Sequence, residues 1–127
     1  MHAEAMNDQG FFEHENPFTG EDPSSRGEQA GYGPSVGENI AMGYQTPREV
    51  VRGWMNSPGH RENILRDYLH LGVGILKGGS GKYGPGEWFY WVQNFGVLWC
   101  LLVRGNYLAK CIWENRMKTF MSIRFGS

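Results

Sequence analysis

Apolar residues three and four positions apart mark helices in the middle of the chain. This spacing relates Val50, Val51, Trp54 and Met55. It predicts a helix over about residues 47–56 with one buried face. The preceding Thr46-Pro47-Arg48-Glu49 forms a capping box with proline at the first helical position. Ser57 and Pro58 provide a second N-cap and first position, and they predict a shorter helix over about 58–66.

The first third of the chain gives weaker periodic signals. Residues 1–9 read as the end of a helix that starts without a cap and that Gly10 stops. Prolines and glycines crowd residues 16–37, which are predicted to be mostly loop with a short helix over Ser24–Ala30. Gly37–Ala41 is expected to be either extended or a single helical turn.

Alternating apolar residues then predict two strands. Leu71, Val73 and Ile75 alternate with glycines, and Trp88–Phe95 reads as a strand with aromatic residues on both faces. The Gly-rich segment 77–86 between them is predicted to be a turn. Helices followed by a strand–turn–strand unit indicate an α+β fold, with helices against a small antiparallel sheet.

The charge balance differs between two parts of the chain. The total is −1, so no global field favours a nucleic-acid partner. Residues 1–96 carry 7 Lys and Arg against 12 Asp and Glu, whereas residues 97–127 carry 5 against 1. The apolar run Val97–Val103 is too short for a transmembrane segment, which needs about 20 residues. Residues 1–6 lack the basic and apolar character of a signal peptide.

Four motifs occur in a fixed order along residues 1–96. They are His14 within Phe-Phe-Glu-His-Glu-Asn-Pro, the box Gly37-Glu38-Asn39-Ile40-Ala41, the segment Trp54–Leu65, and Tyr90–Gly96. Together they resemble the bacterial branch of the CAP superfamily, the SCP-like extracellular domain related to cysteine-rich secretory proteins, antigen 5 and plant pathogenesis-related proteins. The resemblance implies a three-layer α–β–α sandwich and an extracellular or cell-surface location.

The resemblance also implies a cleft lined by histidines and glutamates, which holds a divalent metal in several eukaryotic relatives. His14 matches the first histidine of that set and Glu38 the first glutamate. The other two positions fall on Ser57 and Tyr90, so the eukaryotic tetrad is incomplete. His60, with Glu62 close by, is interpreted as the bacterial replacement.

Two imidazoles and a carboxylate can bind zinc with a water in the open position, so His14, Glu38 and His60 are the predicted metal ligands. The same groups could instead transfer protons. Structural alternatives stay open: His14 could cap the turn at Asn16, and Glu38 could hold the Gly-rich segment through loop N–H groups.

Two further carboxylates have structural interpretations. Glu49 is interpreted as a capping-box residue, and Glu62 could be only a solvated carboxylate favoured by the helix dipole. Trp54 and the aromatics of Trp88–Trp91 are expected in the core, although exposed aromatics would suit a sugar or lipid. Gly78–Lys82 is interpreted as a hairpin turn because it lacks the strand–loop–helix context of a phosphate loop.

The family domain would end at Phe95-Gly96, so residues 97–127 are predicted to be a non-family C-terminal extension. Its apolar run invites self-association. Cys100 and Cys111 lie there and could form one disulfide, but their spacing defines no framework. The start without a cap predicts that the domain, residues 1–96, is incomplete at its N-terminus.

Two function classes follow. The first is a non-enzymatic secreted or cell-surface binding module for a metal, a small ligand, a lipid or a cell-wall glycan. The second is a cell-wall hydrolase that uses Glu38 or Glu62 as acid or base, with His14 and His60 positioning water or zinc. The first is preferred because no nucleophile motif and no complete catalytic set is present.

Overall fold

A computed structural model describes residues 1–78 and 88–98 of the chain. The described helices are α1 (His2–Gln9), α2 (Pro23–Gln29), α3 (Pro47–Met55) and α4 (Pro58–Leu65). The described strands are β1 (Tyr32–Met42), β2 (His70–Gly78) and β3 (Trp88–Leu98). None of these helices is long and apolar enough to cross a membrane.

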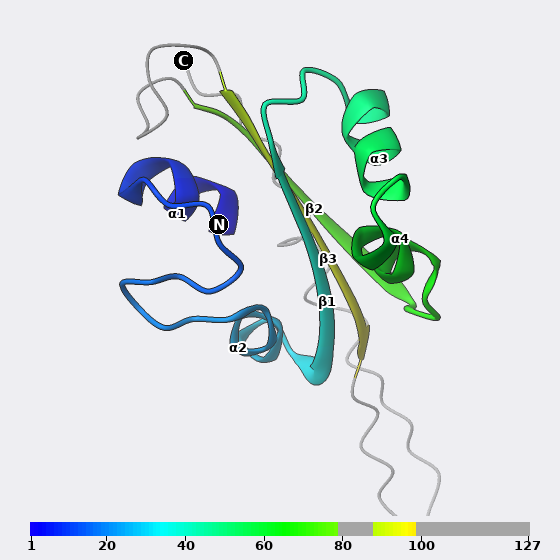
Figure 1. Ribbon diagram of the computed structural model, residues 1–127. Helices are drawn as coiled ribbons and strands as arrows, with labels where there is room; N and C mark the ends of the chain where they lie inside the picture. The colour runs from blue at the N-terminus through cyan, green and yellow to red at the C-terminus, as the bar shows by residue number, and fades with distance from the viewer. Residues whose placement is uncertain (79–87, 99–127) are drawn as a thin grey trace, which may run out of the picture.

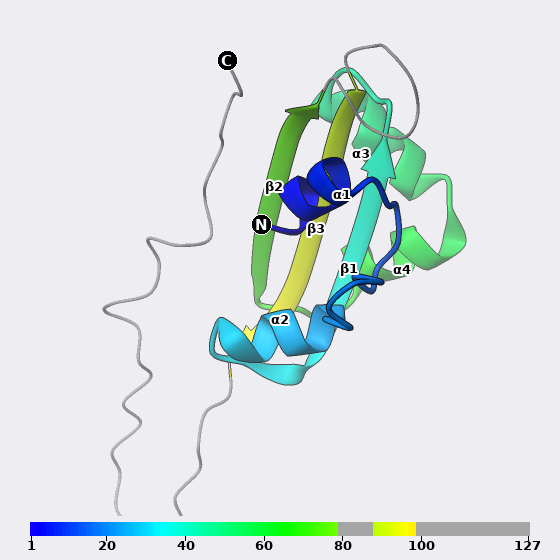
Figure 2. The same ribbon diagram turned by 90° about the vertical axis from the view of Figure 1, so that its left-hand side faces the viewer.

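The three strands form one antiparallel sheet in the order β1-β3-β2, with β3 in the centre. Figure 1 shows the sheet nearly edge-on, with α1 and α2 on one side and α3 and α4 on the other. Figure 2 shows the face that α1 and α2 cover. The structure is therefore an α–β–α sandwich, and the predicted α+β class is confirmed.

Each face of the sheet has its own hydrophobic cluster. The cluster beneath α1 contains Ala3, Met6, Phe11, Ile40, Tyr90 and Val92. The cluster beneath α3 contains Ala41, Val50, Trp54 and Trp91. Successive residues of a strand point to opposite faces, so consecutive residues of β1 and β3 supply both clusters. This explains why β3, the only described strand with two neighbours, carries aromatic residues at successive positions.

The predicted helix ends are mostly confirmed. Gly10 follows α1 with φ 69°, in the left-handed region that favours glycine. At α3, the Glu49 backbone N–H donates to Thr46 Oγ1, while Glu49 Oε2 accepts from the Thr46 backbone N–H at 3.0 Å. Glu49 is thus the capping-box residue that the sequence predicted.

The prediction of loop over most of residues 16–37 was wrong at its end. Strand β1 begins at Tyr32, and Gly37–Ala41 is the middle of an 11-residue strand. Pro34 lies inside this strand, and it is tolerated because β1 is at the edge of the sheet. Proline and glycine are typical of loops, so an edge strand that contains them is easily predicted to be a loop from the sequence.

Strand β2 was correctly located, but its glycines are the buried residues. Gly72 and Gly74 are buried, while 53% of Leu71 and 36% of Val73 are exposed. The glycines face α1: a Cβ on Gly74 would lie 3.1 Å from Met1 Sδ. Ile75 packs against the cluster beneath α3, and Leu71 and Val73 lie on the same face, farther from α3.

Two predictions lie outside the described residues. They are the turn within 77–86, including most of Gly78–Lys82, and the extension beyond Leu98 with its cysteines and its self-association. Gly78 pairs with Trp88 across adjacent antiparallel strands. Strand β3 runs to Leu98, two residues past the expected end of the domain.

Candidate functional site: a buried ion cluster at Glu38

Glu38 is the centre of a charged cluster on the face of the sheet that α1 and α2 cover. Its side chain is only 1% exposed. Glu38 Oε2 accepts a hydrogen bond from Arg26 Nη2 at 2.9 Å, and Glu38 Oε1 lies 2.9 Å from His14 Nδ1. Because a carboxylate only accepts hydrogen bonds, His14 Nδ1 carries the proton in this pair. Both oxygens of Glu38 are therefore engaged.

Arg26 connects the cluster to the loop that precedes α2. Its Nη1 donates to the Glu21 carbonyl oxygen at 2.8 Å, and its Nη2 also donates to the His14 carbonyl oxygen at 2.8 Å. Asp22 is the N-cap of α2, and its carboxylate accepts a hydrogen bond from the Ser25 backbone N–H at 2.7 Å. That hydrogen bond lowers the pKa of Asp22. The ion pair thus fixes the loop and α2 onto β1.

His2 completes the cluster from α1. Its Nε2 lies 2.9 Å from the Glu13 carbonyl oxygen and 4.0 Å from Glu38 Oε1. Burial lowers the pKa of His2, although the negative charge of Glu38 acts in the opposite direction. His2 is therefore a neutral neighbour of the Arg26–Glu38 pair near pH 7.

The structure gives His14 and Glu38 partners other than the structural alternatives, in which His14 capped the turn at Asn16 and Glu38 bound loop N–H groups. The turn after His14 is held by Asn16, whose Oδ1 accepts from the Phe18 N–H at 2.9 Å. Within residues 1–78 and 88–98, the carboxylate of Glu38 binds the side chains of Arg26 and His14 and no loop N–H group. The side chain of His14 is 51% exposed, which makes it the solvent-facing member of the cluster.

His60 approaches β1 from the other face of the sheet. Asn39, the neighbour of Glu38, is fully buried, and its amide donates to the His60 carbonyl oxygen at 3.1 Å. The same amide lies 3.2 Å from Gln93 Oε1, and Asn63 Nδ2 donates to Asn39 Oδ1 at 3.0 Å. Hydrogen bonds of the neutral Asn39 amide therefore hold α4 against one face of β1. The charged side chain of the preceding residue, Glu38, holds α2 against the other face.

The imidazole of His60 is oriented by its own helix. Its Nδ1 lies 2.9 Å from Ser57 Oγ. Ser57 is the N-cap of α4 as predicted, but its hydroxyl caps no backbone N–H and pairs with His60 instead. Burial and the charge of His14 lower the pKa of His60. A positive charge on His14 therefore disfavours the protonated form of His60.

Glu62 stands apart from this cluster. Its side chain is 70% exposed and lies 3.8 Å from Arg66 on the outer surface of α4. Tyr90, at the position of the family's second histidine, is 1% exposed in the cluster beneath α1. The sequence brought four candidates together, and the described structure pairs only His14 with Glu38 directly.

The predicted metal ligands do not form a ready three-ligand set. Among the described residues, no group of three or more His, Cys, Asp and Glu side chains is arranged to hold a metal ion. A cation at Glu38 would meet the guanidinium already bound to Oε2 at 2.9 Å. The Nε2 atoms of His14 and His60 remain as donors, one fewer than the three protein ligands usual in catalytic zinc sites.

Two members of the cluster, His2 and Arg26, were not found by sequence reasoning. His2 lies 36 positions from Glu38 and Arg26 lies 12 positions away. The one available signal was the arginine of a predicted short helix that otherwise carries small and polar residues. A buried carboxylate needs such a cation, but the sequence does not say which arginine supplies it.

The fold and these motifs match known proteins. The model of the cysteine-rich secretory protein family, CAP, matches residues 1–95. The match covers most of the chain, and the protein therefore belongs to the CAP family. An outer surface protein of Borrelia burgdorferi has a similar fold, with a TM-score of 0.63 and 23% identity over 77% of this chain and 68% of that one.

Two proteins of Bacillus subtilis strain 168 are similar in sequence. The uncharacterized protein YkwD is 40% identical over 95 residues, which are 73% of this chain and 33% of YkwD. The uncharacterized membrane protein YlbC is 34% identical over 99 residues, which are 77% of this chain and 25% of YlbC. The chain thus spans at most a third of these two relatives.

Proposed function

We propose that this CAP domain is a binding module of the cell surface or extracellular space, and that it binds through the face covered by α1 and α2. The location rests on the family and on the surface protein of similar fold. Exposed His14 supplies a polar contact, and the buried Arg26–Glu38 pair behind it holds His14 in place. A cell-wall glycan is the ligand class we would test first.

The observation that supports binding over hydrolysis is the state of the carboxylates. A general acid must carry a proton that it can give to the substrate. Both carboxylate oxygens of Glu38 already pair with protein side chains, Oε2 with Arg26 and Oε1 with His14, and its side chain is 1% exposed. Glu62 lies on the outer surface of α4 with Arg66. Neither carboxylate is a free group beside the histidines.

The test is sedimentation of the purified chain with isolated bacterial cell wall. We expect the protein in the pellet and no soluble wall fragments in the supernatant. His14→Ala should weaken binding, while Glu62→Gln, a change on the opposite face, should leave it unchanged. Release of fragments that Glu38→Gln abolishes would instead establish the hydrolase.

Zinc binding is the second part of the proposal. The free Nε2 atoms of His14 and His60 would be the ligands, and Glu38 would orient His14 from behind, as carboxylates do for zinc-binding histidines. An ion bound only by the folded state raises the unfolding midpoint. We expect such a rise with zinc after chelator treatment, lost in both His14→Ala and His60→Ala. If zinc left the unfolding midpoint unchanged, the proposed zinc site would be rejected and the proposed binding module would stand without it.

A further inference from the structure

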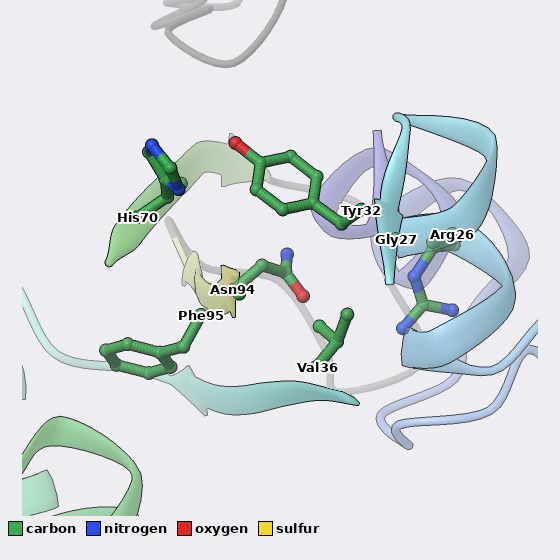
Figure 3. A pocket seen from close by; sticks show the side chains of 9 residues that line it. Arg26, Gly27, Tyr32, Val36, His70, Asn94 and Phe95 are labelled. Carbon is green, nitrogen blue, oxygen red and sulfur yellow. The ribbon is translucent and has the colours of Figure 1, made fainter. Parts of the chain in front are cut away.

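A second feature of the same face is a small pocket between α2 and the sheet (Figure 3). Residues from α2 and all three strands line it, and its volume is about 50 Å³. One water occupies about 10–15 Å³ by this measure, so the pocket has room for about four water-sized atoms. It can hold the end of a ligand or one small functional group.

The walls of the pocket are built by close packing at two glycines. A Cβ on Gly27 would lie 2.5 Å from Val36 Cγ2, and a Cβ on Gly96 would lie 2.8 Å from Tyr32 Cδ1. The glycines therefore let the Val36 and Tyr32 side chains rest directly on α2 and β3. Val36 and Tyr32 thus give the pocket its apolar wall, whereas the ring of Phe95 turns to the other face and stacks on Tyr68 with centroids 5.6 Å apart.

Two buried polar atoms of the lining have no hydrogen-bond partner among the described residues. They are Nε of Arg26 and Nδ1 of His70. His70 packs edge-on against Tyr32 with ring centroids 5.7 Å apart, which holds its imidazole at the wall. Buried polar atoms without protein partners are rare, and a bound water or ligand is a usual reason for one.

Figure 3 shows the Asn94 amide between these two atoms, with Arg26 and His70 on opposite sides of it. Asn94 belongs to β3, where it pairs with Glu38 on one side and Gly72 on the other. Its amide offers both a donor and an acceptor. The polar groups along the pocket thus include a fixed donor, Arg26 Nε–H, and an amide that can turn either way.

The charge of Arg26 decides which ligand suits the pocket. Its guanidinium is already neutralised by Glu38 at 2.9 Å, and Glu38 is almost fully buried. A second carboxylate at Arg26 Nε would lie near that of Glu38, and Arg26 alone would have to offset the repulsion between them. A neutral group with a strong acceptor gains the same hydrogen bond without this repulsion.

We infer that the pocket binds an acetamido group, the neutral N-acetyl unit of an amino sugar or of an acylated peptide. Its four heavy atoms match the available space. The carbonyl oxygen accepts from Arg26 Nε–H or Asn94, the N–H donates to the Asn94 amide oxygen, and the methyl packs against Val36. The inference names the ligand chemistry of the proposed binding module, and in that respect rests on it.

The test is an NMR titration of the full, isotope-labelled chain with four probes. N-acetylglucosamine and N-acetylalanine methylamide carry the acetamido group on a sugar and on a peptide, while glucose lacks it and acetate replaces it by a charge. We expect saturable shifts of the backbone amides of Gly72, Asn94 and Gly96 with at least one acetamido probe. Which probe binds tighter distinguishes the two sources.

Variants separate the pocket from the rest of the surface. Asn94→Leu keeps the volume and removes the amide, and it should weaken binding about tenfold, the loss expected for a buried hydrogen bond. Asn56→Leu makes the same change at the exposed end of α3 and should have no effect. His70→Phe keeps the ring against Tyr32 and should leave the affinity unchanged, because the acetamido group bonds Arg26 and Asn94 and not His70.

Binding of acetate or glucose as tight as the acetamido probes, shifts confined to other residues, or no shift at all would overturn the inference. So would an unchanged affinity of Asn94→Leu. The proposed function fails separately, through lack of sedimentation with cell wall. A chain that sediments with wall and ignores all four probes would refute the acetamido pocket and leave the binding module in place.

Discussion

Glu38 and Asn39 are neighbours in β1, yet they hold opposite faces of the sheet by different chemistry. Glu38 binds Arg26 of α2 and His14 of the preceding loop through charge-assisted hydrogen bonds. Asn39 binds α4 and Gln93 of β3 through neutral amides. The charged side includes an exposed histidine and a pocket, whereas Asn39 is fully buried. The charged side of β1 is thus partly open to solvent through His14, whereas the neutral network around Asn39 is buried.

The largest effect is expected from removing the cation of the charged face. Arg26→Met keeps an unbranched side chain but leaves the Glu38 carboxylate buried without its counter-ion. Breaking a buried pair in this way costs about 3–5 kcal/mol of unfolding free energy, measured by urea titration at pH 7. Arg48→Met, at an exposed position of α3, is the control.

The double variant Arg26→Met with Glu38→Gln sharpens this result. It removes the stranded charge, so it should recover part of the lost stability. If Arg26→Met were no less stable than Arg48→Met, the ion pair would not hold α2 to the sheet.

A somewhat smaller effect is expected on the neutral face. Asn39→Leu leaves the His60 carbonyl oxygen and the Gln93 and Asn63 amides short of a partner. Unsatisfied buried polar groups cost about 1–3 kcal/mol each, and partial relaxation should leave about 2–3 kcal/mol in total. The loss should not depend on salt, in contrast to that of Arg26→Met. Equal salt dependence of both variants would remove the distinction between the faces.

The pH dependence of stability compares one histidine from each face. Burial lowers the folded-state pKa of both His2 and His60 below 6.5. Below pH 6.5 the unfolded chain therefore binds more protons than the folded one. Their contribution is fully present above pH 6.5 and is lost as the pH falls towards the folded-state pKa values. Urea titrations between about pH 4.5 and 8 measure it.

His2→Gln and His60→Gln should each remove part of that loss. His14→Gln should raise the pKa of His60, followed by NMR, because the charge of His14 lowers it. If His14→Gln left the pKa of His60 unchanged, the two imidazoles would not interact across the edge of the sheet.

The smallest effect is expected at Glu62. Glu62→Gln removes an exposed ion pair with Arg66, and exposed pairs contribute little because water screens them and both side chains lose freedom. The unfolding midpoint should stay within experimental error at any salt concentration. A clear loss would show that the outer surface of α4 has a structural or coupling role that its exposure does not suggest.

Local signals predicted most elements of the fold. The capping box at Thr46 and Glu49, the stop at Gly10 and the alternation before Ile75 act over a few residues, and each was found where expected. Strand β1 was underestimated because Pro34 and its glycines imitate a loop. The CAP motifs supplied the layer arrangement that periodicity alone did not.

The candidate site was predicted only in part. His14 and Glu38 do meet, but their motifs gave no indication that Arg26 would occupy the other carboxylate oxygen. His60 was also grouped with them by motif order; its helix packs on the other face of the sheet, and the charge of His14 is its one described link to this cluster. The order of motifs records which residues belong to a family, not the side of a sheet on which each one lies.

The helix ends, the three layers and the family could all be read from the order of residues, because capping and periodicity depend on neighbours within a turn or two and the motifs are continuous segments. The neutralisation of Glu38 by Arg26, and the pocket that Gly27 and Gly96 open beside it, could not. Those features join residues far apart in the chain, and they depend on how α2 packs against the sheet. The alternation of side chains along β1 then places Glu38 on one face of the sheet with charged partners and Asn39 on the other face with neutral amides.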